Sequence, residues 1–219
     1  MKNNDAKLSG ITNIREYEAK SILKDYGIMS PAGMLIEKLP DTISLTFPVV
    51  LKVSDERILH KTDVGGVRLG IRNRRELATE FNRMKKKFPD SLFLIEEMLP
   101  KGVEFIIGVT RDPVFGSILM LGAGGIYTEL YKDVVFRKIP VSRKDAEDMI
   151  EGIHSGAFCK GFRGIRIDCS LLADMLIRIS GMVVSGKYDV ESMDLNPVIV
   201  TDTTATIADA KLSFRRRPD

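Results

Sequence analysis

The sequence predicts an α+β protein built from two lobes, and three observations lead to that prediction. Segments with the apolar period of helices are interleaved with short β-branched runs typical of strands, and the strands concentrate in the middle of the chain. No internal repeat or low-complexity linker interrupts the pattern. The length of 219 residues and the hydrophobic content of 44% suffice for a large core or for two tightly joined lobes.

The first two predicted helices lie in the first half of the chain. Apolar residues at helical spacing begin after a possible Thr12 or Asn13 cap, and Gly27 ends the run in the way that a glycine ends many helices. A second helix is predicted over residues 74–87, because apolar residues recur every three or four positions behind an Asn73 cap. Its outer face is basic.

Two further helices are predicted in the second half of the chain. Ser142 and Asp145 form a variant of the capping box and open a short helix. A longer helix is predicted over residues 168–184 behind an Asp168 cap, because apolar residues fill one of its faces. Both helices therefore carry a start signal in the sequence itself.

Short β-branched and apolar runs predict the strands. These runs cover residues 48–54, 67–71, 92–95, 103–109, 116–121, 134–139, 198–200 and 205–208. The last two are expected to form a hairpin around residues 202–204. From this order of elements we expect a tail over residues 1–12, lobes over residues 13–97 and 98–214, and a solvated basic tail over residues 215–219.

Composition and charge argue against nucleic acid and membrane as partners. The net charge of +3 arises from 33 basic and 30 acidic residues spread along the whole chain, which is not the pattern of a polyanion-binding protein. Trp is absent and aromatic residues make up 7% of the chain, so base-stacking platforms are not expected. No run approaches the roughly 18 apolar residues of a membrane span.

The two cysteines predict neither a disulfide framework nor a zinc site. Cys159 and Cys169 lack a C-x-x-C spacing, and a reducing compartment fits them. The first ten residues are polar and contain no apolar core before a cleavage site. We therefore expect a cytoplasmic location.

Lys52 is the first candidate for chemistry, because it stands in the middle of an otherwise apolar strand. Burying an ammonium group is costly unless a negative group compensates it, and a phosphate would do so. An edge strand offers an alternative, since the side chain would then reach water. The residue alone leaves both interpretations open.

The loop over residues 58–67 combines His60 with a cation, a carboxylate and the pair Gly65-Gly66. Its backbone amides can approach phosphates closely, and a neutral imidazole can accept a phosphoryl group covalently. A surface or structural histidine is the commoner case when His60 is taken alone. The loop is therefore a candidate nucleophile site.

The run Gly122-Ala123-Gly124-Gly125 follows a predicted apolar strand. It is too short for a Walker loop and lacks the Gly-Lys-Ser/Thr ending. A tight turn explains the glycines equally well, because glycine tolerates positive φ. The run is therefore only a weak indicator of phosphate binding.

The segment Asp194-Leu195-Asn196-Pro197 and the later Asp209 supply oxygen ligands on either side of the predicted hairpin. If the hairpin forms, these groups can converge on magnesium, which takes one or two protein ligands and fills its other positions with phosphate oxygens and water. Alternatively, Asn196-Pro197 is a turn and Asp209 a strand-end cap. With Lys52 and His60, the oxygen ligands complete the set of groups that phosphoryl transfer needs.

These motifs resemble those of the β subunits of ADP-forming acyl-CoA synthetases, a branch of the ATP-grasp superfamily related to the succinyl-CoA synthetase β subunit. The resemblance runs from about Glu16 to Leu212, and Leu59 to Val67 is its most specific segment. Its other markers are Glu16 to Lys20, Pro48 to Lys52, Glu96 to Glu104, Gly108 to Gly116, Gly122 to Gly125, and Asp194 to Pro197. The resemblance implies an ATP-grasp fold with nucleotide bound between two α+β lobes.

The resemblance also implies the residues that bind ATP or ADP. Lys52 would hold the nucleotide phosphates. The segment Glu97-Met98-Leu99 would form the interlobe hinge whose backbone pairs with adenine, and Glu104 would reach the ribose.

The same resemblance implies the metal ligands and the catalytic residues. Asn196 and Asp209 would bind magnesium. His60 would be phosphorylated transiently and would carry the phosphoryl group between a histidine of a partner subunit and ADP. Asp194 would support the phosphohistidine.

The implied activity interconverts acyl-CoA, ADP and phosphate with free acid, ATP and CoA. Nothing in the chain resembles the CoA-binding domains of the family, so a separate CoA-binding α subunit is implied, in an assembly of two α and two β subunits. Two alternatives stay open. A stand-alone ATP-grasp ligase that joins a carboxylate to an amine would not need His60, and a nucleotide-sensing regulatory subunit would not need catalysis.

Overall fold

The computed structural model describes residues 10–58, 61–125 and 133–215. The chain divides into two compact units, which we call unit 1, with residues 1–30 and 101–219, and unit 2, with residues 31–100. Each unit combines helices and strands, so the predicted α+β class is confirmed. The boundary near residue 100 was expected, whereas the assignment of the first thirty residues to unit 1 differs from the predicted division at residues 13–97 and 98–214.

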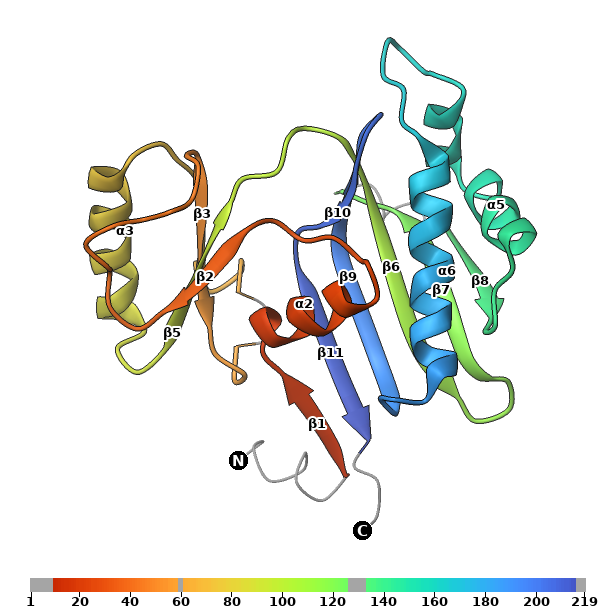
Figure 1. The fold of residues 1–219 in the computed structure, drawn as a ribbon, viewed down its shortest axis with the longest axis horizontal. Coiled ribbons are helices and arrows are strands. Elements are labelled where there is room, and N and C mark those ends of the chain that lie inside the picture. Colours follow the sequence, from red (N-terminus) through yellow and green to blue (C-terminus); the bar gives the residue numbers. More distant parts are fainter. Residues whose placement is uncertain (1–9, 59–60, 126–132, 216–219) are drawn as a thin grey trace. The chain divides into compact units, whose positions relative to one another are not determined.

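Unit 2 is a four-stranded antiparallel sheet covered by one helix (Figure 1). The strand order is β2 (Gly33–Ile36), β5 (Leu92–Glu97), β3 (Val49–Ser54) and β4 (Val67–Ile71). Helix α3 (Arg74–Lys87) begins at Asn73, whose side chain accepts a hydrogen bond from the Glu76 amide, as predicted. Leu77, Phe81 and Met84 of α3 are buried in the core of this unit.

Unit 1 is built on a seven-stranded antiparallel sheet (Figure 1). The strand order is β1 (Ile11–Ile14), β11 (Ala210–Arg215), β9 (Val190–Val200), β6 (Val103–Asp112), β7 (Gly116–Ala123) and β8 (Val134–Lys138), and β10 (Ala205–Ile207) pairs with β9. The first described strand thus pairs with the last one. Ile11 lies opposite Arg215.

Helices cover one face of the unit 1 sheet. They are α2 (Glu16–Asp25), α5 (Arg143–Glu151) and α6 (Cys169–Ser185), and the 3-10 helix η1 (His154–Cys159) precedes α6. On β6, Phe105, Ile107 and Val109 are buried in the core with these helices, whereas Glu104 and Thr110 alternate with them and are exposed. We call the face that carries Glu104 the open face of unit 1.

The helix signals of the second half of the chain are confirmed in detail. Ser142 and Asp145 form a complete capping box at the start of α5. Asp168 accepts hydrogen bonds from the Ser170 amide at 2.9 Å and from the Ser170 hydroxyl at 2.7 Å at the start of α6. Both hydrogen bonds lower the pKa of the Asp168 carboxyl, and the one from the Ser170 hydroxyl contributes most.

Both predicted tails need correction. Residues 11 and 12 are not part of a tail, because β1 begins at Ile11, and Thr12 and Asn13 lie within this strand rather than at a helix cap. Arg15 is the N-cap of α2 and makes no side-chain capping bond. At the other end, Arg215 is the last residue of β11 and forms an ion pair with Glu191. Residues 216–219 of the predicted basic tail lie outside the described residues.

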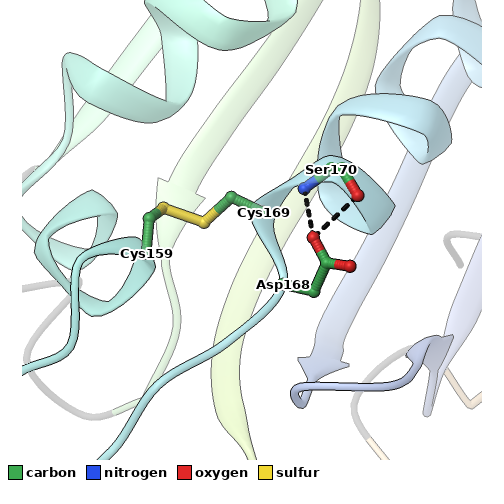
Figure 2. The surroundings of a disulfide bond; sticks show 4 residues. All are labelled: Cys159, Asp168, Cys169 and Ser170. Carbon is green, nitrogen blue, oxygen red and sulfur yellow. Dashed lines mark hydrogen bonds between the residues drawn. A yellow bond between two sulfur atoms is a disulfide. The ribbon is translucent and has the colours of Figure 1, made fainter.

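The cysteine prediction is wrong. Cys159 at the end of η1 and Cys169 at the start of α6 form a disulfide, and their Cα atoms lie 5.5 Å apart (Figure 2). A spacing of ten residues gives no such signal, because the fold brings η1 back against the start of α6. Within the described segments, none of the helices combines the length and apolarity that crossing a bilayer requires.

Candidate functional site

Lys52 is buried in unit 2, with 7% of its surface exposed. Strand β3 lies between β5 and β4, so the edge-strand alternative is wrong. The ammonium group of Lys52 lies 2.8 Å from the carboxylate of Glu96, whose side chain is equally buried on β5. The negative group that compensates the lysine within the protein is thus a carboxylate, a partner that the analysis of the sequence did not predict.

The predicted hinge Glu97-Met98-Leu99 begins at the end of β5. The Glu97 amide donates to the Ala32 carbonyl at 2.9 Å, and the Met98 amide donates to the Pro48 carbonyl at 3.0 Å. The Glu97 carboxylate accepts a hydrogen bond from the Thr46 amide at 2.7 Å. Unit 2 therefore fixes the backbone where the segment begins, while the side chain of Met98 is exposed.

His60 lies outside the described residues, but the loop that follows it is held from two sides. The Gly66 amide donates to the Lys61 carbonyl at 2.6 Å, and Lys87 at the end of α3 donates to the Val64 carbonyl at 2.6 Å. A Cβ atom on Gly66 would lie 2.5 Å from a methyl group of Val53, so this position requires glycine.

The chain before His60 is held by an ion pair at the end of β3. Asp55 accepts two hydrogen bonds from the guanidinium of Arg57, at 2.9 and 2.6 Å, and one from the Ser91 hydroxyl at 2.8 Å. The side-chain hydrogen bond from Arg57 contributes most to lowering the pKa of Asp55 far below its usual range. The segments on both sides of His60 therefore have defined anchors.

In unit 1, the glycine run packs directly on Glu104. The Gly124 amide donates to the Glu104 carbonyl at 2.7 Å, and a Cβ atom on Gly124 would lie 2.5 Å from the carbonyl carbon of Glu104. Gly125 has a φ of +84°. The glycines of the run therefore allow a close backbone approach as well as a turn. They lie next to Glu104, the residue that the resemblance assigns to the ribose.

Asn196 and Asp209 are brought together at the end of β9. The Asn196 amide donates to the Asp209 carbonyl at 3.2 Å, and the Ala208 amide donates to the Pro197 carbonyl at 2.8 Å. Asn196 lies inside β9 rather than in a turn, so the turn alternative is wrong. Both side chains offer oxygen atoms, which are the ligands that magnesium prefers.

Asp194 lies two residues before Asn196, in the middle of the open face. One row of paired residues crosses this face through Lys211 on β11, Asp194 on β9, Gly108 on β6, Met120 on β7 and Phe136 on β8. The ammonium of Lys211 lies 3.3 Å from the Asp194 carboxylate, and both side chains are partly exposed. Gly108 places no side chain beside Asp194. Lys211 was missed, although its alternation with buried Ala210 and Leu212 indicates an outward position on a strand.

The structure thus assembles the predicted residues in two sets. In unit 1, Glu104, Asp194 and Asn196 lie on neighbouring strands of one sheet, and Asp209 lies in the turn before β11. Unit 2 holds Lys52 and the predicted hinge. In the part of the chain that is described, no three His, Cys, Asp or Glu side chains gather as a metal site. A metal held by Asn196 and Asp209 would therefore need further ligands from a bound phosphate or from water, which is the usual mode for magnesium.

Comparisons with known proteins agree along nearly the whole chain. A family model described as an ATP-grasp domain matches residues 5–214. The β subunit of acetate–CoA ligase (ADP-forming) II from Pyrococcus furiosus is 39% identical, and the match covers 94% of this chain and 93% of that subunit. Acetate–CoA ligase (ADP-forming) II from Archaeoglobus fulgidus is 35% identical over 92% of this chain, but the chain spans only 30% of that longer protein.

Solved structures also match nearly the whole chain. An acetyl-coenzyme A synthetase from Ca. Korarchaeum cryptofilum, in complex with coenzyme A, Ca-AMPCP and HgCl+, matches with a TM-score of 0.86 and 36% identity over 96% of both chains. A second structure of this synthetase, with coenzyme A and Mg-AMPPCP, matches with a TM-score of 0.83 and has its phosphohistidine segment pointing towards the nucleotide-binding site.

Proposed function

The chain belongs to the ATP-grasp family, and from this premise we propose that it is the nucleotide-binding β subunit of an ADP-forming acyl-CoA synthetase. The observation that carries the proposal is the match to nearly the full length of a β subunit, at 39% identity. Because this relative is named a β subunit, it supports a partner α subunit, to which we assign the binding of CoA. We further propose the assembly of two α and two β subunits that the resemblance implies.

Each unit carries residues that we assign to the nucleotide. Lys52 neutralises phosphate charge, and the Glu96 carboxylate, 2.8 Å from its ammonium group, orients it. Since the amides of Glu97 and Met98 bond within unit 2, we assign the adenine contacts to the Met98 carbonyl and the Leu99 amide. Glu104, supported by the glycine run, binds the ribose.

Asn196 and Asp209 fit magnesium, because they offer two hard oxygen ligands on adjacent backbone segments. When bound there with a nucleotide, the ion would offset the negative charge of the phosphate oxygens. Asp194 is assigned to the support of phosphorylated His60, and Lys211 fixes the Asp194 carboxylate from the neighbouring strand.

The proposed reaction of this subunit is one phosphoryl transfer. A phosphoryl group on an imidazole nitrogen of His60 passes to ADP when a β-phosphate oxygen attacks phosphorus in line. The new O–P bond forms as the P–N bond breaks, and the bonding electron pair returns to the ring nitrogen. In the opposite direction ATP phosphorylates His60, and the α subunit receives the group on its own histidine.

The test is phosphate labelling of the chain with γ-labelled ATP and magnesium, with and without the α subunit. We expect acid-labile label on the wild-type chain and none on the His60→Ala variant. His154→Ala is the matched control, because His154 is the other of the two histidines and its ring is exposed beside Asp133. Nucleotide binding without any label in the presence of the partner would contradict the relay and favour a ligase or a sensor.

A second test concerns the partner. We expect the purified chain to bind nucleotide with magnesium but to make no acyl-CoA until the α subunit is added. Net acyl-CoA synthesis by the chain alone would contradict the two-subunit proposal. We also propose a cytoplasmic location, in which the Cys159–Cys169 disulfide would be an exception to the usual reduced state of cysteines.

A further inference from the structure

A buried ion pair on α2 contacts residue 208, next to Asp209, and takes no part in the reaction described above. Glu16 and Lys20 lie one turn apart on α2, and their charged groups are 2.7 Å apart. Their side chains are only 2% and 5% exposed. Burying two charges costs free energy that the attraction between them often does not repay, and α2 already packs through buried Ala19 and Leu23. Core packing alone therefore gives no reason for the pair.

The ammonium group of Lys20 makes one further contact that connects it to the metal ligands. It donates a hydrogen bond to the carbonyl of Ala208 at 2.7 Å. Ala208 immediately precedes Asp209, and the same short segment bonds to β9 through the Ala208 and Asn196 amides. Residues 208–209 are thus held by β9 and by a charge-assisted hydrogen bond from α2.

The chain that follows α2 adds a second contact to the same place. The Ile207 amide donates to the carbonyl of Met29 at 2.9 Å, which forms a parallel bridge between residues 29 and 206. Helix α2 also packs beside β11, which begins at Ala210 (Figure 1). Contacts from residues 20 and 29 therefore hold the turn between β10 and β11 that contains Asp209.

We propose that Lys20, oriented by Glu16, is a positioning residue for the magnesium site. It fixes the backbone of residues 208–209. The Asp209 carboxylate and the side-chain amide oxygen of Asn196 then keep the spacing that one ion requires. Glu16 also cancels the charge of Lys20, which would otherwise disfavour a divalent cation nearby. The inference rests on the proposed function of Asn196 and Asp209.

The experiment measures the affinity of the 219-residue chain for ADP by calorimetry, once with saturating Mg²⁺ and once with EDTA. The ratio of the two affinities is the coupling between metal and nucleotide, and it does not depend on catalysis. We expect Lys20→Met to reduce this coupling about tenfold, the lower end of losses seen when groups behind a metal ligand are removed, while the affinity in EDTA stays unchanged.

Two further variants separate positioning from stability. Lys20→Met removes the cation that pairs with the buried Glu16, so the double variant Glu16→Gln with Lys20→Met removes both charges and restores the fold. We expect the double variant to keep the reduced coupling. The matched control is Lys144→Met, which breaks an exposed pair of the same spacing with Asp148 on α5 and should leave the coupling unchanged.

The outcomes distinguish this inference from the proposed function. If the folded double variant shows the same coupling as the wild type, Lys20 does not position the site. The assignment of Asn196 and Asp209 to magnesium would then be unaffected. If the wild-type chain binds ADP equally well with Mg²⁺ and with EDTA, the assignment of Asn196 and Asp209 as metal ligands itself fails. If Asp209→Ala and the double variant both lose the coupling while Lys144→Met retains it, the inference is supported.

Discussion

The two units carry their functional groups in opposite environments. In unit 2 the phosphate-binding candidate Lys52 lies in a central strand, buried and paired with Glu96. In unit 1 the candidates Glu104 and Asn196 are exposed on the open face of a sheet whose other face forms the core. We infer that the functional residues of unit 2 also stabilise its fold, whereas those of unit 1 contribute little to stability. Each of the following predictions tests one side of this comparison.

The largest effect is expected from Lys52→Met in unit 2. The substitution removes the phosphate-binding cation, which is also the ion-pair partner of the buried Glu96 carboxylate. It should cost about 3–5 kcal/mol of unfolding free energy and also lower the affinity for nucleotide. Urea unfolding and calorimetry with ADP measure the two losses. Exchanging both Lys52 and Glu96 for Met should recover the stability but not the affinity. If the Lys52→Met chain is as stable as the wild type, function and stability are not coupled in unit 2.

A smaller effect is expected from the disulfide of unit 1. Replacing Cys159 and Cys169 with Ser opens a short loop and should cost about 2–3 kcal/mol, without changing ADP affinity, because the bridge joins η1 to α6 (Figure 2). Thermal unfolding with and without a reductant provides the measurement. The wild type should lose stability on reduction and the variant should not. Equal behaviour of the two chains would mean that the thiols are not bonded.

The smallest effect on stability is expected from Asp194→Asn. Its pair with Lys211 is partly exposed, and such pairs contribute less than about 1 kcal/mol. The variant should nevertheless label His60 with phosphate more slowly, since it lacks the supporting carboxylate. Lys211→Met breaks the same pair and should have an equally small effect on stability. A large loss of stability in Asp194→Asn would show that the open face is not separable from the fold.

Sequence alone predicted the elements whose signals are local. Helices α3 and α6 have both an apolar face and a capping residue, and each was placed within one or two residues of its observed bounds. Strands β1, β2 and β11 were missed. β1 has only four residues, and Ile11 pairs with Arg215 at the far end of the chain, so its stability comes from a partner that no sequence window contains.

Among the candidate site residues, too, those with a local signal were predicted and those that depend on the fold were missed. The sequence identified Lys52 as an unusual strand residue, because a charge among apolar residues is visible locally. Its partner Glu96 and the Lys20 contact to Ala208 depend on strand order and on helix docking, which only the fold supplies. The Cys159–Cys169 bridge was missed for the same reason. The roles given to single residues came from the resemblance and stay predictions.

The discontinuity of unit 1 has a consequence for protein synthesis. Ala19, Leu23 and Ile28 belong to a core whose other members all follow residue 100, and β1 pairs with a strand near the C-terminus. A ribosome releases these residues before their partners emerge. Unit 2 is complete well before then and can fold in the meantime. Residues 11–28 therefore reach their native contacts only after the whole of unit 2 has been made.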